Sequence, residues 1–239
     1  MYFYTNSEII SYLNPLELLS SIIAGLAHDV AHPALNNKYL VNSRDDISLV
    51  YNDRSVLENM HASKSFDIMK KDGCDLLQGF TFDDWTCVRK NVISMILETD
   101  MAKHFEVLGK FRTRVTTLGD IDLQRTEDKE LVMNMAIKCA DIGHAAKCSE
   151  LHEKWTAFVC EEFFHQGDLE KEKGLPVSMY CDRNNTDIPK SQAGFIKNIC
   201  LPLYETWSNY LKTENVYRNC IEQLKINLRS WEDKDRKVF

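Results

Sequence analysis

Residues 14–37 read NPLELLSSIIAGLAHDVAHPALNN, and this stretch decides how the rest of the chain is interpreted. Its opening Asn-Pro pair is typical of a helix start, and apolar residues recur at helical spacing over residues 16–26. His28 and Asp29 then stand side by side at the end of the apolar run. An unpaired carboxylate on an apolar surface costs on the order of several kcal/mol unless a cation meets it.

Two interpretations of the His28–Asp29 pair follow from the residues alone. A divalent metal is a fitting partner, because neutral imidazole and carboxylate both ligate zinc and similar ions. Alternatively, Asp29 caps a following helix that has Pro33 in its first turn. The pair by itself does not decide between a metal ligand and a helix cap.

The composition describes an ordinary soluble globular protein, with 44% hydrophobic and 27% charged residues among 239. Nine Gly and five Pro are few for this length, which disfavours a strand-and-turn architecture. The net charge of −7 disfavours a nucleic-acid polymer or an anionic membrane as partner. An anionic substrate would therefore need local positive charge, which a metal supplies.

The eight cysteines show no CxxC spacing and lie mostly within apolar helical patterns. We interpret them as reduced thiols in a cytoplasmic setting. The first residues show no signal-peptide pattern, and no apolar run reaches the length of a membrane span. A membrane tether on a longer parent chain stays open.

Helical periodicity recurs along the chain, without sustained two-residue alternation, and predicts a single all-α domain of roughly ten helices. The spacing of Ser55 and Glu58 predicts a capping box at a helix that runs to about residue 71. Gly167 and Gly174 are expected to close another helix. The remaining helices are expected at about 16–26, 45–51, 84–97, 99–115, 131–141, 189–211 and onward to 231.

Five polar features, distant in sequence, share one trait, which is that they lie at or near the ends of apolar helices. They are His28–Asp29 with His32, Glu58 with His61, Thr99–Asp100, Asp141, and Gln192 with Phe195. Each also has a purely structural interpretation: a capping partner of Ser55 (Glu58), a core histidine (His61), a water-facing helix end (Asp141), an exposed amide (Gln192) and a core ring (Phe195). Taken singly, none of them specifies a function.

Taken together, the sequence blocks around these residues resemble those of one family. HDVAHP, YNDRSVLEN-x-H, TDMAKH, CADIGH, EEFF-x-QGD and SQAGF occur in the order found in class I cyclic-nucleotide phosphodiesterases, which are compact multi-helix HD-type domains. The resemblance covers residues 16–207. ADIGHAAK and GLP-x-S-x-x-CDR resemble the calmodulin-stimulated branch most.

The resemblance implies a metal centre with two ions. His28, Asp29 and Asp141 would ligate zinc, and Asp29 would also contact a second ion, magnesium or manganese. His32, Glu58 and Thr99 would hold the waters around that second ion, as residues behind a metal's direct ligands do. Asp29, His32 and Glu58 are thus the implied catalytic residues.

The resemblance also implies a base pocket. Gln192 would hydrogen-bond the purine edge, and Phe195 and Val159 would sandwich the ring. His144 occupies a position whose residue varies with base preference. The rest of the wall would comprise Trp155, Thr156 and Gln166.

The implied activity is hydrolysis of cyclic AMP, cyclic GMP or both to the 5′-monophosphate by a two-metal-activated hydroxide. The implied partner is thus a small-molecule cyclic nucleotide. Regulatory domains on a longer parent chain and a homodimer stay open.

The chain departs from the family pattern in one respect. The family carries an upstream HN-x-x-H, whose first histidine is the general acid and whose second ligates the zinc, whereas here no histidine precedes His28. We therefore expect residues 1–239 to be a partial catalytic domain of low activity, with apolar surface exposed near Ile9 to Leu19.

Two alternatives to that function remain. One is a degenerate, non-catalytic phosphodiesterase-like module that binds nucleotide or acts as a scaffold. The other is a different HD-type metal phosphohydrolase, which Gln192 and Phe195 in SQAGF disfavour.

Overall fold

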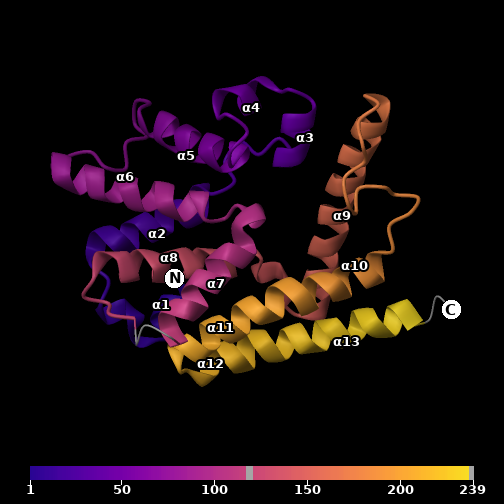
Figure 1. Ribbon diagram of the computed structural model, residues 1–239. Coiled ribbons are helices and arrows are strands. Elements are labelled where there is room, and N and C mark those ends of the chain that lie inside the picture. Colours follow the sequence, from indigo (N-terminus) through magenta and orange to yellow (C-terminus); the bar gives the residue numbers. More distant parts are fainter. Residues whose placement is uncertain (117–120, 237–239) are drawn as a thin grey trace. The chain divides into compact units, whose positions relative to one another are not determined.

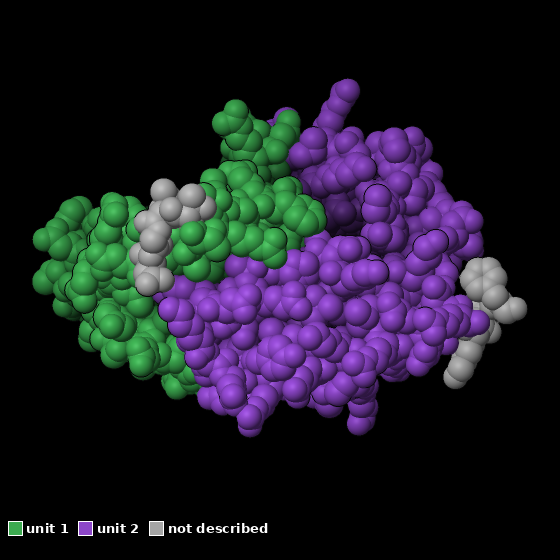
Figure 2. Space-filling view, turned by 60° about the horizontal axis from the view of Figure 1, so that its bottom comes forward, with its two compact units in different colours: residues 1–32, 50–141 green, residues 33–49, 142–239 purple. Residues whose placement is uncertain are grey.

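The computed structural model describes residues 1–116 and 121–236, and Figure 1 shows their path. Helices joined by turns and loops make up these described residues, with no strand among them, which confirms the all-α prediction. They fall into two compact units, coloured separately in Figure 2. Unit 1 comprises residues 1–32 and 50–141, and unit 2 comprises residues 33–49 and those from 142 onward. That the chain forms a single domain stays a prediction.

Unit 1 is built around α2, which packs against α5, α6 and α8. Its helices are α1 (Tyr2–Thr5), α2 (Pro15–Ala27), α5 (Val56–Met69), α6 (Phe82–Leu97), α7 (His104–Thr116) and α8 (Thr126–Asp141). The core between them consists of apolar side chains that recur at helical spacing, among them Ile23, Val88, Met95, Ile96, Val132 and Met135. Each of these residues lies within a helix range predicted from the sequence.

The start of α2 is fixed by a reciprocal capping box. The Asn14 side chain accepts the Glu17 N–H at 2.9 Å, and the Glu17 carboxylate accepts the Asn14 N–H at 2.7 Å. Lys129 on α8 reaches the same carboxylate at 3.2 Å. Because Glu17 is buried, these donors and the ammonium offset the loss of hydration of its charge.

Unit 2 contains the longest helix of the described residues, α9 (Ser149–Glu172), and a long paired rod. In Figure 1, α10 (Ile188–Phe195) and α11 (Leu201–Leu211) run beside α13 (Glu222–Arg236). Trp207 and Tyr204 of α11 and Leu224 of α13 are fully buried. The remaining helices are α3 (Asn37–Asn42), α4 (Asp46–Val50, whose last residue belongs to unit 1) and α12 (Glu214–Val216). None of the described helices, in either unit, is long and apolar enough to cross a membrane.

The predicted capping box at Ser55 and Glu58 is wrong. Ser55 has φ 43°, in the left-handed region, and its side chain makes no cap hydrogen bond. Its hydroxyl instead donates to Asp100 Oδ2 at 2.8 Å. The start of α5 is therefore held by a residue 45 positions away, which local sequence cannot show.

The prediction that Gly167 helps to close its helix is also wrong, because α9 continues to Glu172 and ends before Gly174, at φ +66°. Gly167 is needed for close approach: a Cβ there would lie 1.8 Å from the carbonyl oxygen of Cys181. The missing side chain lets a later loop pack directly on the helix backbone.

Other boundaries differ in smaller ways. The helix predicted over 99–115 begins as a 3₁₀ turn at Met101–Lys103 before α7. The helix predicted over 189–211 begins at Ile188 and contains a π turn at Ile196–Cys200. The cap of α3 is Asn36, whose side chain accepts the Tyr39 N–H at 2.9 Å, so Asp29 is not that helix cap.

The predicted exposed apolar surface is only partly where it was expected. Within Ile9 to Leu19, Ile9 and Leu13 are buried and Tyr12 is exposed. Ile22 and Leu26, in the second half of α2, are also exposed, Leu26 by 82%.

Candidate metal centre and base pocket

Unit 1 brings together three side chains that the sequence separates. His28 Nε2 lies 3.2 Å from Asp29 Oδ2 and 3.2 Å from Asp141 Oδ1. One ligand atom from each of the three residues falls within 4.8 Å of the others, which is the spacing of a shared cation. The three residues predicted to ligate zinc therefore lie together, although Asp29 and Asp141 are 112 residues apart in the sequence (141 − 29).

Two helix ends place these side chains. His28 directly follows α2, and Asp141 is the last residue of α8, which packs against α2. The carboxyl end of a helix carries partial negative charge, so both helices favour a cation at this point. His28 Nδ1 lies 3.1 Å from the Gly25 carbonyl oxygen. When Nδ1 carries a proton, it donates to that oxygen, and the Nε2 lone pair of the neutral ring is available to ligate a metal.

The electrostatics of the cluster favour positive charge. Hydrogen bonds to Asp141 and then Asp29 raise the pKa of His28 to about 10 despite partial burial. The same contact with His28 lowers the pKa of Asp29. Asp29 thus stays ionised, and the cluster favours positive charge at the position of Nε2.

Two further histidines lie beside the cluster. His61 is 2% exposed; its Nε2 is 3.7 Å from Asp29 Oδ1, and its Nδ1 is 2.8 Å from the Val30 carbonyl oxygen. The His32 ring stacks on His61 with a centroid distance of 5.6 Å. Burial lowers the pKa of His61, which favours its neutral form next to Asp29.

The other predicted metal-centre residues lie on the neighbouring elements of unit 1. Glu58 is in the first turn of α5, three residues before His61. Thr99 is buried, and its hydroxyl donates to the Ile96 carbonyl at 2.7 Å. The roles of His32, Glu58 and Thr99 in holding water stay predictions.

The donor set fits a divalent metal. One imidazole nitrogen and two carboxylate oxygens are ligands that zinc accepts, with further positions left for water or substrate. Asp29 is 61% exposed at its side chain, so the cluster is open to an ion from solvent.

Unit 2 contains a separate cavity of about 150 Å³. Its lining combines one amide, several rings and small hydroxyl side chains: His144, Thr156, Val159, Cys160, Phe163, Tyr180, Thr186, Ser191, Gln192 and Phe195. All five residues predicted to bind the base, His144, Thr156, Val159, Gln192 and Phe195, are therefore together in one cavity.

Ring and hydroxyl contacts order this pocket. The His144 ring stacks on Phe195 with a centroid distance of 6.2 Å and an interplanar angle of 12°. The Thr156 hydroxyl donates to Gln192 Oε1 at 3.5 Å. His144 also stacks on the buried His152, whose Nε2 accepts the Trp231 indole N–H at 2.7 Å.

The sequence prediction missed some of the lining and included two residues outside it. Trp155 and Gln166, expected on the wall, do not line the cavity: Trp155 is 52% exposed and Gln166 is buried. Tyr180 was missed because it lies in a loop without periodicity. Cys160 and Phe163 follow Val159 on α9, and helical spacing from Thr156 could have identified them.

Comparison with known proteins places this arrangement in a class. A model of the 3′5′-cyclic nucleotide phosphodiesterase family matches residues 1–223. The 3′,5′-cyclic-AMP phosphodiesterase 4C of Rattus norvegicus is 40% identical over 199 residues, covering 81% of this chain and 37% of that protein. The probable 3′,5′-cyclic-AMP phosphodiesterase pde-4 of Caenorhabditis elegans is 40% identical over 221 residues, covering 90% of this chain and 32% of that protein.

A solved structure agrees with these matches. The crystal structure of the phosphodiesterase domain of the RhoPDE fusion protein from the choanoflagellate Salpingoeca rosetta superposes with a TM-score of 0.91 at 29% identity. The match covers 99% of this chain and 74% of that one. An all-helical fold with one imidazole and two carboxylates gathered in unit 1 describes a helical domain with a candidate metal site. The chain belongs to the 3′5′-cyclic nucleotide phosphodiesterase family.

The chain spans about a third of the length of the curated relatives it matches. These relatives do not test the resemblance to the calmodulin-stimulated branch, which stays a prediction.

Proposed function

We propose that this chain takes part in hydrolysis of a 3′,5′-cyclic nucleotide to the 5′-monophosphate. The observation that carries the proposal is the convergence of His28, Asp29 and Asp141 in a member of the phosphodiesterase family. The curated relatives in the comparison are named as cyclic-AMP phosphodiesterases, which favours cyclic AMP as a substrate. Cyclic GMP is the second substrate to be tested.

The residues of unit 1 act on the phosphate side of the reaction. His28, Asp29 and Asp141 would hold zinc, and Asp29 would also contact a magnesium or manganese ion. Divalent ions bound there neutralise phosphate charge and lower the pKa of a ligated water. His61 and the Gly25 carbonyl orient Asp29 and His28, so the ligands are positioned before an ion arrives.

The residues of unit 2 act on the base. Gln192 offers an amide to a purine edge, and Phe195, backed by His144, offers a ring face for stacking. Val159 closes the cavity with an apolar side chain. Such a pocket excludes water from the base while fixing its orientation.

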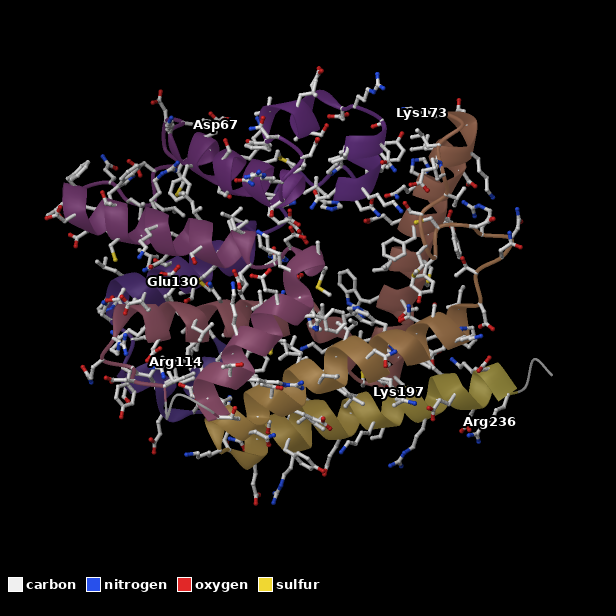
Figure 3. All side chains as sticks on the ribbon, viewed as in Figure 1. Asp67, Arg114, Glu130, Lys173, Lys197 and Arg236 are labelled. Atoms are coloured by element: carbon white, nitrogen blue, oxygen red, sulfur yellow. The ribbon has the colours of Figure 1, made fainter. Side chains whose placement is uncertain are left out.

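The test of the metal centre measures bound zinc and turnover together. We expect Asp141→Asn to weaken zinc binding by at least about 10–100-fold, the typical loss even for a supporting residue. Hydrolysis of cyclic AMP in saturating magnesium should fall with it. The matched control is Asp67→Asn, because Asp67 lies on α5 of the same unit, is exposed and pairs only with Lys64 within the described residues (Figure 3). Equal zinc affinity in wild type and Asp141→Asn would refute the assignment.

A non-catalytic nucleotide-binding module is the second candidate, favoured by a base pocket whose lining residues all lie in unit 2, whereas the candidate metal ligands lie in unit 1. The two functions differ in turnover and not in binding. If the chain binds 5′-AMP and zinc but shows no hydrolysis even when an upstream HN-x-x-H segment is supplied, the non-catalytic function is correct.

A further inference from the structure

Glu170, on α9, is a fully buried carboxylate surrounded by hydrogen-bond donors. Ser178 donates twice, through its backbone N–H to Oε2 and its hydroxyl to Oε1, both at 2.7 Å. Gln166 Nε2 donates to Oε1 at 3.0 Å. Three donors to one buried carboxylate stabilise its charge and fix the position of Ser178.

The direction of the hydrogen bonds in this network is set at Gln166. The backbone N–H of Asn36 donates to Gln166 Oε1 at 2.9 Å, which orients the amide so that its NH₂ group faces Glu170. All donors therefore point at position 170. A glutamine there would place a fourth donor among them, and a buried unmatched donor is costly.

A second attachment holds the same loop three residues later. Cys181 is buried, and its carbonyl lies so close to α9 that only glycine fits at position 167. The loop is thus attached to α9 at Ser178 through Glu170 and at Cys181 through Gly167.

Tyr180 lies between these two attachments in an unusual backbone conformation. Its φ is +66°, in the left-handed region that a bulky residue rarely adopts. Such a conformation persists when the surrounding structure holds it. The Tyr180 side chain is half exposed and lines the same cavity as Gln192 and Phe195.

We propose that Glu170 is a positioning residue for base binding, which acts through Ser178 to hold Tyr180 in the wall of the base pocket. Tyr180 is then a specificity-determining residue, whose ring adds an aromatic face and whose hydroxyl can donate to or accept from a polar base edge. This inference rests on the proposed function, because it takes the cavity to be the base pocket.

The first experiment compares Glu170→Gln with Glu172→Gln, an exposed position at the end of the same helix. Calorimetric titration with 5′-AMP and 5′-GMP measures binding of the two bases without turnover. We expect Glu170→Gln to raise the Kd at least about fivefold, while Glu172→Gln matches wild type. Chymotrypsin cleavage after Tyr180 should accelerate about tenfold in Glu170→Gln alone, because the loop is released. Thermal unfolding confirms that each variant is folded.

The second experiment asks whether Glu170 acts through Tyr180. Tyr180→Ala should change the ratio of the 5′-AMP and 5′-GMP Kd values, and Tyr180→Phe separates the hydroxyl from the ring. In the double variant Glu170→Gln/Tyr180→Ala, binding should be no weaker than in Tyr180→Ala, since residues that act as one unit are not additive.

Several results would overturn the inference. Wild-type cleavage and binding in folded Glu170→Gln would do so, and so would fully additive losses in the double variant. If Glu170→Gln does not fold, Ser178→Ala removes only the hydroxyl donor and should give a smaller shift in the same direction; no shift there counts against the inference. If wild type binds neither nucleotide, the proposed function fails and Tyr180 loses its assigned role, while cleavage still shows whether Glu170 holds the loop.

Discussion

His28 in unit 1 and His152 in unit 2 are the same residue type placed in opposite environments. His28 lies between two carboxylates, which raise its pKa to about 10. His152 is 1% exposed and lies between the rings of His144 and Trp231, and burial lowers its pKa to about 4. The candidate metal centre of unit 1 thus favours positive charge, whereas the ring stack of unit 2 disfavours it.

The difference matches the two parts of a cyclic nucleotide. A phosphodiester carries negative charge and resists attack by hydroxide until that charge is neutralised. A site that gathers ligands for divalent ions can supply the neutralising charge. A purine is neutral and planar, and it binds through stacking and directed hydrogen bonds. Because Trp231 donates to His152 Nε2, a neutral imidazole is needed there to keep the stack behind the base pocket in order.

The largest expected effect concerns the general acid that protonates the leaving oxygen. No histidine precedes His28, and His61 is engaged by Val30 and Asp29, so we assign no general acid for the leaving oxygen within the described residues. A longer chain that includes an upstream HN-x-x-H segment should hydrolyse cyclic nucleotide at least about a hundredfold faster, the lower end of what general acid catalysis contributes. The two chains are compared in saturating zinc and magnesium.

Comparable rates for the two chains would place the acid within residues 1–239. A longer chain in which the first histidine of that motif is replaced by asparagine serves as the matched control.

The second effect tests the pKa contrast through stability. The unfolded pKa of His152 is near 6.5 and the folded one is about 4, so the unfolded state binds the proton first. The contribution of neutral His152 to the free energy of unfolding is therefore complete above pH 6.5. It is lost as the pH falls toward 4, which lowers that free energy by up to about 3 kcal/mol. Urea unfolding of wild type should show this loss, and His152→Gln should show less of it, since a glutamine can accept from Trp231 without titrating.

His165→Gln is the control, because His165 is exposed on the same helix. If the free energy of unfolding depended on pH identically in wild type and His152→Gln, the inferred pKa difference between His28 and His152 would be wrong. His104, also buried and with a pKa lowered to about 4, contributes a similar loss that persists in both proteins.

The third and smallest effect sharpens the role of the base pocket. In a chain with measurable turnover, Gln192→Ala should raise KM about tenfold or more, because a site built to hydrogen-bond a polar edge loses its partner. Phe195→Ala should also raise KM, by removing a stacking face worth about 1–3 kcal/mol. Lys197→Ala, on the exposed side of the same rod (Figure 3), should leave KM unchanged. If both pocket variants kept the wild-type KM for both nucleotides, the base would have to bind outside this cavity.

Sequence was sufficient wherever periodicity or local capping controls the structure. The start of α2 follows from Asn14 and Pro15, and the apolar stripe of α8 leads directly to Asp141. The predicted zinc ligands and the predicted base-pocket residues came from ordered sequence blocks, and the structure brings each group together.

Features that depend on contacts between distant residues could not be predicted. Ser55 adopts a left-handed conformation because its hydroxyl serves Asp100, and Gly167 is fixed by the carbonyl of Cys181. Tyr180 lines the proposed base pocket from a loop in which Ser178 donates to Glu170. In each case the partner lies at least eight residues away, which local pattern does not reveal.

The position of the proposed metal ligands at two helix ends limits where this chain can accept an inserted residue. His28 directly follows α2, and Asp141 ends α8. One inserted residue in either helix would turn the ligand by about 100° and advance it by about 1.5 Å. An insertion in the loop between α5 and α6 should therefore leave metal binding intact. An insertion in α2 or α8 should abolish metal binding, whatever the identity of the inserted residue.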